Sequence, residues 1–396
     1  MSVPEGLPGS RLAWGALVAA ALVLVNATYV VSSLGILHKP RKVLETDHFI
    51  YLDMARGPEA EGAPAGKAPF CWRVLTPWLV RLLSRCGLGL NAAFYLLTNL
   101  FLFAFLFSLY LYLTESGCGQ GLAMLGIALA GFVQGAVRWY EYQYWMTDPL
   151  CLFLVMLAFR WILRGRDAAL VALGAVGVLA RETYLLVFVP WILGAARTRR
   201  AGALARALEG ILVALGVLAL LRYSIVPGND PDTLRTAQHA IEFRIRHFFD
   251  NQAYLLSVGS LGVLFPMALL SPSGLGAWVR TRYDEAAYLL CVYLSLAMGN
   301  NTERLLAYAL PVAVPFALRQ LERFAKEARA PLAVLAAACL VLQVFVWTQT
   351  RLLGEQGLSA FQPANGLVAA ALAAFWLACM ARLWLASRHA GGGLAT

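Results

Sequence analysis

Charged side chains are scarce in this sequence. Asp, Glu, Lys and Arg make up 14% of its 396 residues, whereas hydrophobic residues make up 60%. A soluble domain usually carries about a quarter charged residues, so the composition excludes an ordinary soluble protein. Hydrophobic runs that approach the roughly 20 residues needed to cross a bilayer recur from end to end. Because backbone groups inside a bilayer must be paired within their own segment, we predict an all-α polytopic membrane protein.

Cysteine pairs at metal-binding spacing are also lacking. The seven cysteines are scattered and no Cys-x-x-Cys occurs, which excludes a cysteine metal framework. Cys71 and Cys86 would be able to pair only if both lie outside the cell. The simpler interpretation is that the cysteines act as small apolar residues in or near helices.

Twelve hydrophobic segments divide the chain, and we expect one transmembrane domain over residues 1–396. The segments lie near residues 12–35, 91–113, 120–137, 148–163, 167–180, 184–195, 207–226, 252–270, 286–299, 305–318, 331–349 and 364–386. The first is too long for a signal-peptide core, which favours a retained span. The fifth, sixth, ninth and tenth are short, which predicts two tight hairpins or broken helices meeting at ARETY and GNNTER.

Basic residues in the short loops predict the orientation. With the N-terminus in the cytoplasm, the inner short loops hold eleven Lys and Arg residues and the outer short loops hold four. We therefore expect a protein of the inner (plasma) membrane with both termini cytoplasmic. Two outer loops follow, residues 36–90 with interfacial amphipathic helices and residues 227–250 with a basic amphipathic helix.

The stretch LETDHFIYLDMARG opens the first outer loop with three carboxylates in a chain that is poor in acids. If it is helical, Asp47 and Tyr51 share one face and Asp53 points elsewhere. Asp47 is then the better candidate for a base, since ionisable groups at a membrane face usually have a partner or a role. The alternative is that Glu45, Asp47 and Asp53 only keep the loop solvated.

Three further motifs bring arginine to the same predicted face. PFCWRVLTPWLVRLLSR carries Arg73, whose planar guanidinium is well shaped to bind a lipid phosphate. ARETY and NNTER carry Arg181 and Arg304, each beside a glutamate, Glu182 or Glu303. An ion pair that closes each hairpin explains these two pairs as well as function does, because unpaired charge is costly near hydrocarbon.

The motif RWYEYQYWMTDPL contains Arg138, Glu141 and Asp148 among many aromatic residues. Aromatic residues are common at membrane interfaces, but they also form platforms for sugar rings, so this motif is a candidate wall of a substrate groove. Asp148 followed by Pro149 is also typical of a helix start with Asp as the N-cap, which alone would explain Asp148.

The basic helix within residues 227–250 would attract anionic head groups through residues such as Arg244 and Arg246, or be a surface helix without a ligand. A metal site is a further open alternative. Glu45, Asp47 and His48, with His239 or His247, would offer ligands to a divalent cation such as Mg²⁺ or Mn²⁺. A metal-free site in which arginine balances phosphate charge is equally consistent with the sequence.

These motifs in their order resemble a known family. A first span, a long outer loop with TDHFIYLDMA and APFCWRVLTPWLV, and then MTDPL, RET and NTERLLAYALPVAVP are similar to bacterial members of the C-type (GT-C) glycosyltransferase superfamily. The resemblance covers most of the chain. It implies a GT-C-like bundle of about 12 transmembrane segments that moves a hexosyl or pentosyl group from a polyprenyl-phosphate donor to a glycan, lipid or protein acceptor. We expect membrane lipid around it and no nucleic-acid partner.

The resemblance and the chemistry together assign roles. In the family, an acid of the first outer loop is the catalytic base, which matches Asp47, and a second acid would be Glu45 or Asp53. Positive charge is needed where the departing phosphate becomes more negative, and we expect it from Arg73, Arg181 and Arg304. The expected substrate groove comprises Tyr51, Arg138, Glu141, Asp148, Glu182, Glu303, Arg244 and Arg246.

A lipid or solute transporter is the main alternative function. Coupled transporters keep their sites near the middle of the membrane on discontinuous helices, often within internal repeats. The spans here hold only scattered neutral polar residues, such as Asn26, Asn99, Gln134 and Gln343, and no repeat stands out. These absences favour the enzyme.

Overall fold

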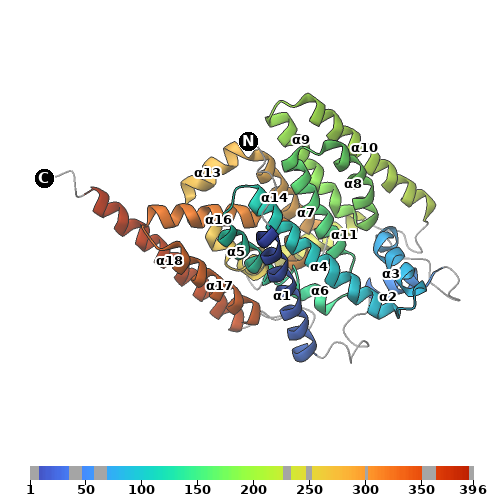
Figure 1. The fold of residues 1–396 in the computed structure, drawn as a ribbon, viewed down its shortest axis with the longest axis horizontal. Coiled ribbons are helices and arrows are strands. Elements are labelled where there is room, and N and C mark those ends of the chain that lie inside the picture. The colour runs from blue at the N-terminus through green and yellow to red at the C-terminus, as the bar shows by residue number, and fades with distance from the viewer. Residues whose placement is uncertain are drawn as a thin grey trace.

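The computed structural model describes residues 9–34, 47–57, 69–225, 233–246, 252–298, 302–349 and 363–391. Every regular element in these residues is a helix (Figure 1). The prediction of an all-α protein is therefore confirmed for the described part of the chain.

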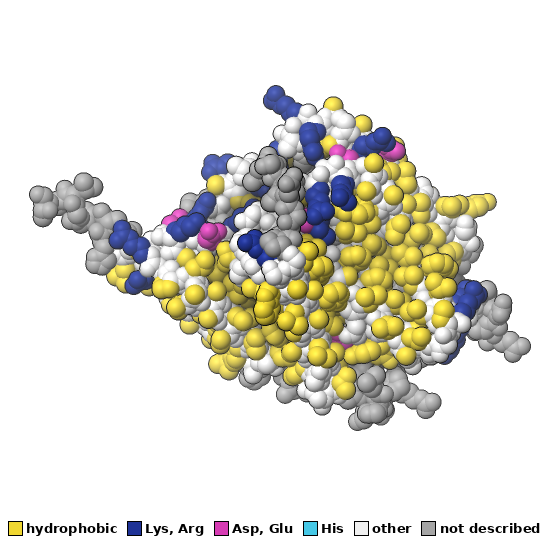
Figure 2. Space-filling model, in the orientation of Figure 1, with side chains coloured by type: hydrophobic (Ala, Val, Ile, Leu, Met, Phe, Trp, Pro, Cys, Tyr) yellow, Lys and Arg dark blue, Asp and Glu magenta, His cyan; other side chains and the backbone are white. Residues whose placement is uncertain are grey.

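Within the described residues, five helices are long and hydrophobic enough to cross a membrane. They are α1 (Gly9–Leu34), α4 (Leu90–Glu115), α10 (Ala201–Ser224), α17 (Leu332–Gln349) and α18 (Pro363–Gly391). In their most hydrophobic windows only 22% of α10, 22% of α17 and 17% of α18 is buried within the protein. Figure 2 shows the result, a broad hydrophobic surface below a rim of Lys and Arg side chains. Such a surface is suited to lipid, and the chain is a membrane protein.

Shorter elements complete the bundle. In chain order they are α2 (Asp47–Arg56), η2 (Phe70–Trp72), α3 (Leu75–Arg85), α5 (Gln120–Gly131), α6 (Arg138–Tyr142), α7 (Asp148–Arg164), α8 (Asp167–Ala180), η3 (Glu182–Val187), α9 (Phe188–Arg197), α11 (Thr233–Arg246), η5 (Leu255–Gly259), α12 (Leu264–Ala268), α13 (Pro272–Thr281), α14 (Tyr283–Ser295), η6 (Leu296–Met298), α15 (Thr302–Leu306), η7 (Ala307–Ala309) and α16 (Leu310–Glu327). Helix α7 is central, since it packs along α4 and against α8 and buries nearly every residue of its first three turns. Its N-terminus therefore lies at one end of the core.

Two hydrophobic segments are interrupted inside the bundle. Helix α5 ends at Gly131, and the segment predicted over 252–270 contains a π-helical turn, η5, before α12. Unpaired backbone groups at such breaks are costly in a bilayer. Asn26 donates to the carbonyl of Gly131 at 3.1 Å, and Gln343 donates to the carbonyl of Phe132 at 2.9 Å and accepts from the amide of Val263 at 2.8 Å. The neutral polar residues of α1 and α17 thus complete the backbone pairing of their neighbours.

Charged groups gather at both ends of the bundle. At one end, Arg160 and Arg164 at the C-terminus of α7 both pair with Glu115 at the C-terminus of α4. At the other end, the N-terminus of α7 meets the C-terminus of α8, and we call this the arginine end because Arg181 and other arginines converge there.

The first loop is held against the arginine end by α2 and α3. Arg81 of α3 donates hydrogen bonds to the carbonyls of Met54 and Ala55 in α2. Trp78 and Leu82 on α3 are 56% and 47% exposed. Helix α3 thus packs Val80 against the core and leaves Trp78 and Leu82 on its outer side, which suits a helix lying in a membrane interface.

Candidate functional site

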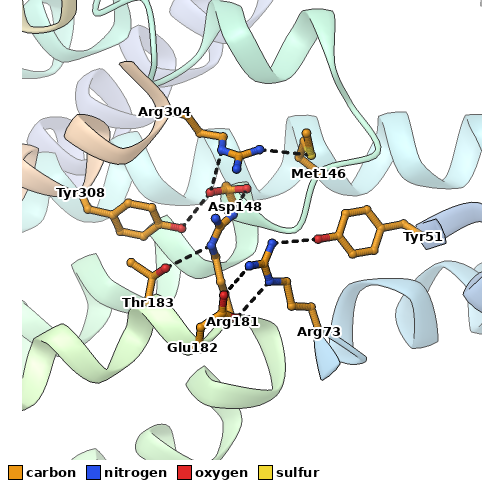
Figure 3. A network of polar contacts seen from close by, with 9 residues as sticks. All are labelled: Tyr51, Arg73, Met146, Asp148, Arg181, Glu182, Thr183, Arg304 and Tyr308. Carbon is orange, nitrogen blue, oxygen red and sulfur yellow. Dashed lines mark hydrogen bonds and ion pairs between the residues drawn. The ribbon is translucent and has the colours of Figure 1, made fainter. Parts of the chain in front are cut away.

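Asp148 is the centre of a polar network at the arginine end (Figure 3). Its carboxylate is fully buried and forms an ion pair with Arg181. The Nε atom of Arg304 lies 3.8 Å from Oδ1 of Asp148, and the hydroxyl of Tyr308 donates to the same oxygen at 3.2 Å. The arginine network, as we call it from here on, comprises Tyr51, Arg73, Asp148, Arg181, Glu182, Arg304 and Tyr308.

The start of α7 explains why Asp148 is available to the arginines. Pro149 lies in the first turn, where a missing N–H costs nothing. The N-cap is Thr147, and no side-chain capping bond forms there. The interpretation of Asp148 as an N-cap is therefore wrong. Its carboxylate pairs with the guanidinium of Arg181, which follows α8, and lies near that of Arg304 in α15, at a helix N-terminus that itself favours negative charge.

Arg73 anchors the first loop to the network. Its Nε donates to Oε2 of Glu182 at 3.0 Å, a second nitrogen pairs with Oε1, and Nη1 donates to the hydroxyl of Tyr51 at 3.1 Å. Arg73 follows η2, Glu182 begins η3 and Tyr51 belongs to α2. Arg73 thus joins three separate segments of the chain. Its bidentate contact with Glu182 is the geometry in which guanidinium groups bind carboxylates most strongly.

Each arginine pairs with an acid from another segment instead of its neighbour in sequence. Arg181 pairs with Asp148, whereas Glu182 pairs with Arg73. Arg304 also approaches Asp148, and the carboxyl oxygens of Glu303 have no hydrogen-bond partner among the described residues. The alternative in which these pairs close their own hairpins is therefore wrong.

The network carries one net positive charge, because three guanidinium groups surround two carboxylates. Burial would raise the pKa of the Glu182 carboxyl, but Arg73 outweighs burial and lowers this pKa to about 2. Glu182 therefore stays ionised at neutral pH. About a third (33%) of its side chain is exposed, against 5% for Arg73, so the network is open to its surroundings on the side of Glu182.

A close approach of two backbones positions Arg304. A Cβ atom on Gly135 would lie 2.0 Å from the carbonyl oxygen of Glu303 and 3.0 Å from the amide nitrogen of Arg304. Only glycine allows α15 to press against the segment that follows α5 in this way. The Arg304 side chain then reaches Met146, whose sulfur lies 3.7 Å from Nη1.

Three hydroxyl groups of this site were not predicted from the sequence. Tyr308 bonds Asp148, and Thr183 accepts from Nε of Arg181 at 3.1 Å. Tyr140 is fully buried within electrostatic range of Asp148, and its hydroxyl has no hydrogen-bond partner among the described residues. The only signal in the sequence was the aromatic-rich motif after Arg138, which is equally typical of an ordinary membrane interface.

The three acids predicted for the first loop, Glu45, Asp47 and Asp53, differ in where the structure places them. Asp47 begins α2, one helical turn before Tyr51 of the network, and its side chain lies outside the described residues. Glu45 also lies outside them. Asp53 forms a surface ion pair with Arg56 at 3.0 Å, so the described contacts do not bring Asp53 to the network.

Two residues of the predicted groove belong to other parts of the molecule. Arg138 lies over the rings of Tyr29 and Trp347 and donates to the carbonyl of Trp347, which joins α6 to α1 and α17. Glu141 is 1% exposed and faces Tyr95 and Asn99 of α4. Burial raises the pKa of the Glu141 carboxyl to about 8 and that of Glu303 to about 7.

The basic helix α11 adds no described contact to the arginine network. Arg246 is exposed on α11, and the side chain of Arg244 lies outside the described residues. No group of three or more His, Cys, Asp or Glu side chains able to hold a metal occurs among the described residues. Of the predicted metal ligands, Glu45, His247 and the side chains of Asp47 and His48 lie outside that part of the chain.

Comparisons with known proteins add no family. No protein-family model matches the chain, and no curated protein sequence matches it significantly.

Proposed function

We propose that the protein is a membrane glycosyltransferase. It moves a sugar from a polyprenyl-phosphate donor to an acceptor at the extracytoplasmic face, and Asp47 is the general base. The observation that supports this most strongly is the convergence of Arg73, Arg181 and Arg304 on one buried site with a net positive charge. That site lies at the end of a bundle whose hydrophobic sides suit a lipid tail.

The reaction makes specific demands on these groups. The acceptor oxygen forms a bond to the anomeric carbon, the bond from that carbon to the phosphate oxygen breaks, and the phosphate keeps the bonding electrons. A carboxylate takes the acceptor's proton, and preorganised guanidinium groups stabilise the negative charge on the leaving phosphate. Asp148 and Glu182 are both held by arginine and are poor bases. A separate acid is needed, and Asp47 lies one helical turn from Tyr51.

The topology proposed for this enzyme has twelve crossings and cytoplasmic termini. In it the arginine end faces outward, where a polyprenyl phosphate carries its sugar. Arg160, Arg164 and Arg197 lie at the opposite end, in agreement with the preference of basic residues for the cytoplasmic side.

The broken segments after Gly131 and before Val263 are the one feature that favours a transporter, because discontinuous helices are common in transporter sites. In transporters the freed carbonyls coordinate the coupling ion. Here Asn26 and Gln343 occupy the carbonyls of Gly131 and Phe132. The breaks are thus satisfied by the protein itself, which supports the enzyme.

Proteoliposomes that contain a radiolabelled polyprenyl-phosphate sugar test the proposal. We expect label on an acceptor with the wild type and none with Asp47→Asn, while Glu209→Gln, an exposed change on α10, retains full transfer. Asp53→Asn tests the second acid, and full transfer would leave Asp53 as the surface partner of Arg56. Full transfer by Asp47→Asn would refute the assignment of the base, and relocation of label across the bilayer without transfer would favour the transporter.

A further inference from the structure

Glu182 occupies the side of Arg73 that an anionic ligand would need. Its carboxyl oxygens accept from Nε of Arg73, at 3.0 Å, and from Nη2. The other terminal nitrogen, Nη1, donates to the hydroxyl of Tyr51. A guanidinium binds carboxylates and phosphates through the same paired N–H groups. A phosphate therefore cannot take this edge of Arg73 in the paired geometry while Glu182 holds it.

The pair of Arg73 and Glu182 is the part of the arginine network that lies nearest to the surroundings. The side chain of Glu182 is 33% exposed, and that of Arg73 is 5% exposed. The side chain of Asp148 is 0% exposed and is contacted by two arginines and by Tyr308. An anion that enters from outside thus meets Glu182 before it meets Arg73 or Asp148.

A second cation lies beside this pair. Figure 3 shows the guanidinium of Arg181 next to that of Arg73, within electrostatic range of it. Burial raises the pKa of the Glu182 carboxyl, and Arg73 and then Arg181 lower it. The carboxylate of Glu182 therefore lies where an anion is attracted by two guanidinium groups, which is a favourable position for a phosphate.

Arg73 has contacts that do not depend on Glu182. Its Nη1 donates to Tyr51 at 3.1 Å, and its guanidinium carbon lies 5.1 Å from the centre of the Phe70 ring. An exchange of the anion on Arg73 would leave both contacts in place. A buried guanidinium without an anion is costly, so Arg73 is expected to hold Glu182 whenever no ligand is bound. The released carboxylate would be hydrated on its exposed side.

We propose that Glu182 occupies the phosphate position on Arg73, holds the guanidinium in place before the donor binds, and leaves when the donor's phosphate binds there. This inference rests on the proposed function, in which Arg73 binds the leaving phosphate. It adds that Glu182 is a positioning residue that acts through Arg73. The donor then exchanges one anion for another at an arginine whose orientation is already set.

Binding of farnesyl phosphate to the purified full-length protein in detergent tests the exchange. This probe is a short polyprenyl phosphate without a sugar, and farnesol, which lacks the phosphate, is the control ligand. We expect Glu182→Gln to bind farnesyl phosphate about tenfold or more tightly than the wild type, because the competing anion is gone. Glu209→Gln, which removes an exposed acid of α10, should bind it as the wild type does. Unchanged or weaker binding by Glu182→Gln would show that Glu182 only supports Arg73 and would overturn the proposal.

A double variant separates exchange from general repulsion between anions. When Arg73 is already replaced by alanine, the further change Glu182→Gln should leave the affinity for farnesyl phosphate nearly unchanged, because the two residues act as a unit. An equal gain with and without Arg73 would mean that Glu182 repels anions from a distance, and the exchange would be refuted. Thermal melting in the same detergent shows whether each variant is folded.

The wild type alone gives a measurement that needs no variant. Carbodiimide coupling of an amine to carboxyl groups, followed by mass spectrometry of the peptides, reports how accessible each carboxylate is. We expect the labelling of Glu182 to rise when farnesyl phosphate is added but not when farnesol is added, with constant labelling of Glu209. Labelling of Glu182 that stays level or falls would contradict the exchange.

These outcomes distinguish the inference from the proposed function. Binding of farnesyl phosphate by the wild type without any sign of exchange would remove the role of Glu182 and leave the phosphate site intact. If the wild type and Glu182→Gln both bind farnesyl phosphate no better than farnesol, the arginine network is not a phosphate site, and the proposed function loses its main support together with this inference.

Discussion

The buried carboxylate of Asp148 pairs with the guanidinium of Arg181. Asp148 is the first residue of α7, and Arg181 directly follows α8. The pair joins the N-terminus of one buried helix to the C-terminus of the next. Arg304 of α15 and Tyr308 of η7, more than 150 residues further along the chain, approach the same carboxylate. One acidic side chain thus fixes the positions of two cations that would otherwise repel each other.

Replacing Asp148 by Asn should destabilise the protein strongly. The change leaves Arg181 and Arg304 buried without their common counter-ion, and breaking a buried pair in this way costs about 3–5 kcal/mol. Thermal melting in detergent measures the loss, with Glu209→Gln as a control of equal charge change in an exposed pair. A melting temperature for Asp148→Asn equal to that of the control would show that the arginines do not depend on this carboxylate.

Removing any one of the three arginines should weaken use of the donor. Arg73→Ala, Arg181→Ala and Arg304→Ala each delete a cation expected to bind the leaving phosphate, and a loss of about tenfold or more in kcat/KM corresponds to about 1.4 kcal/mol of lost stabilisation. Transfer rates measured over a range of donor concentrations give this value. Unchanged donor kinetics in all three variants would restrict the arginines to holding the fold together.

Stability should fall as the pH rises towards 8, and Glu141 should account for part of the fall. Burial raises the pKa of its carboxyl from 4.5 to about 8. Between these values the folded protein keeps the proton and the unfolded chain loses it, so folding stability decreases with rising pH, by at most about 1.4 kcal/mol per unit for one group. Melting temperatures from pH 5 to 8 should show a flatter profile for Glu141→Gln. Identical slopes in the variant and the wild type would contradict this reading.

Gly135→Ala should disturb the arginine end without touching a charged group. The new methyl would lie 2.0 Å from the carbonyl oxygen of Glu303, so α15 and Arg304 must shift. We expect lower stability and weaker donor use. Gly216→Ala on α10 is the matched control, because nothing lies within 4 Å of its Cβ position and alanine is favoured over glycine in a helix by about 0.5–1 kcal/mol. Equal behaviour of the two variants would show that α15 has room to move.

The bounds of a helix were predictable from the sequence where charged residues flank the hydrophobic run on both sides. Residues 167–180 were predicted as one segment and form α8 with the same bounds. The segment over 252–270 was predicted as a single run, but it contains η5 and α12, because hydropathy does not register a break whose backbone is paired by a distant Gln343.

The site was predictable as a gathering of arginines but not as a set of pairs. Topology alone brought Arg73, Arg181 and Arg304 to one end, and their contacts lie in one network. Which acid pairs with which arginine depends on packing between segments. The sequence therefore suggested Glu303 as the partner of Arg304 and an N-cap role for Asp148, whereas Asp148 is the acid that the arginines approach. Tyr308 has no distinguishing pattern in a hydrophobic run.

The hydrogen bonds of Asn26 set a limit on how this protein can be engineered. Asn26→Leu would make α1 more hydrophobic and ease its insertion into the bilayer. The same change would remove the side-chain oxygen that accepts from the indole nitrogen of Trp347 and the side-chain nitrogen that donates to the carbonyl of Gly131. A protein optimised for delivery to the membrane would then assemble poorly once it arrived there.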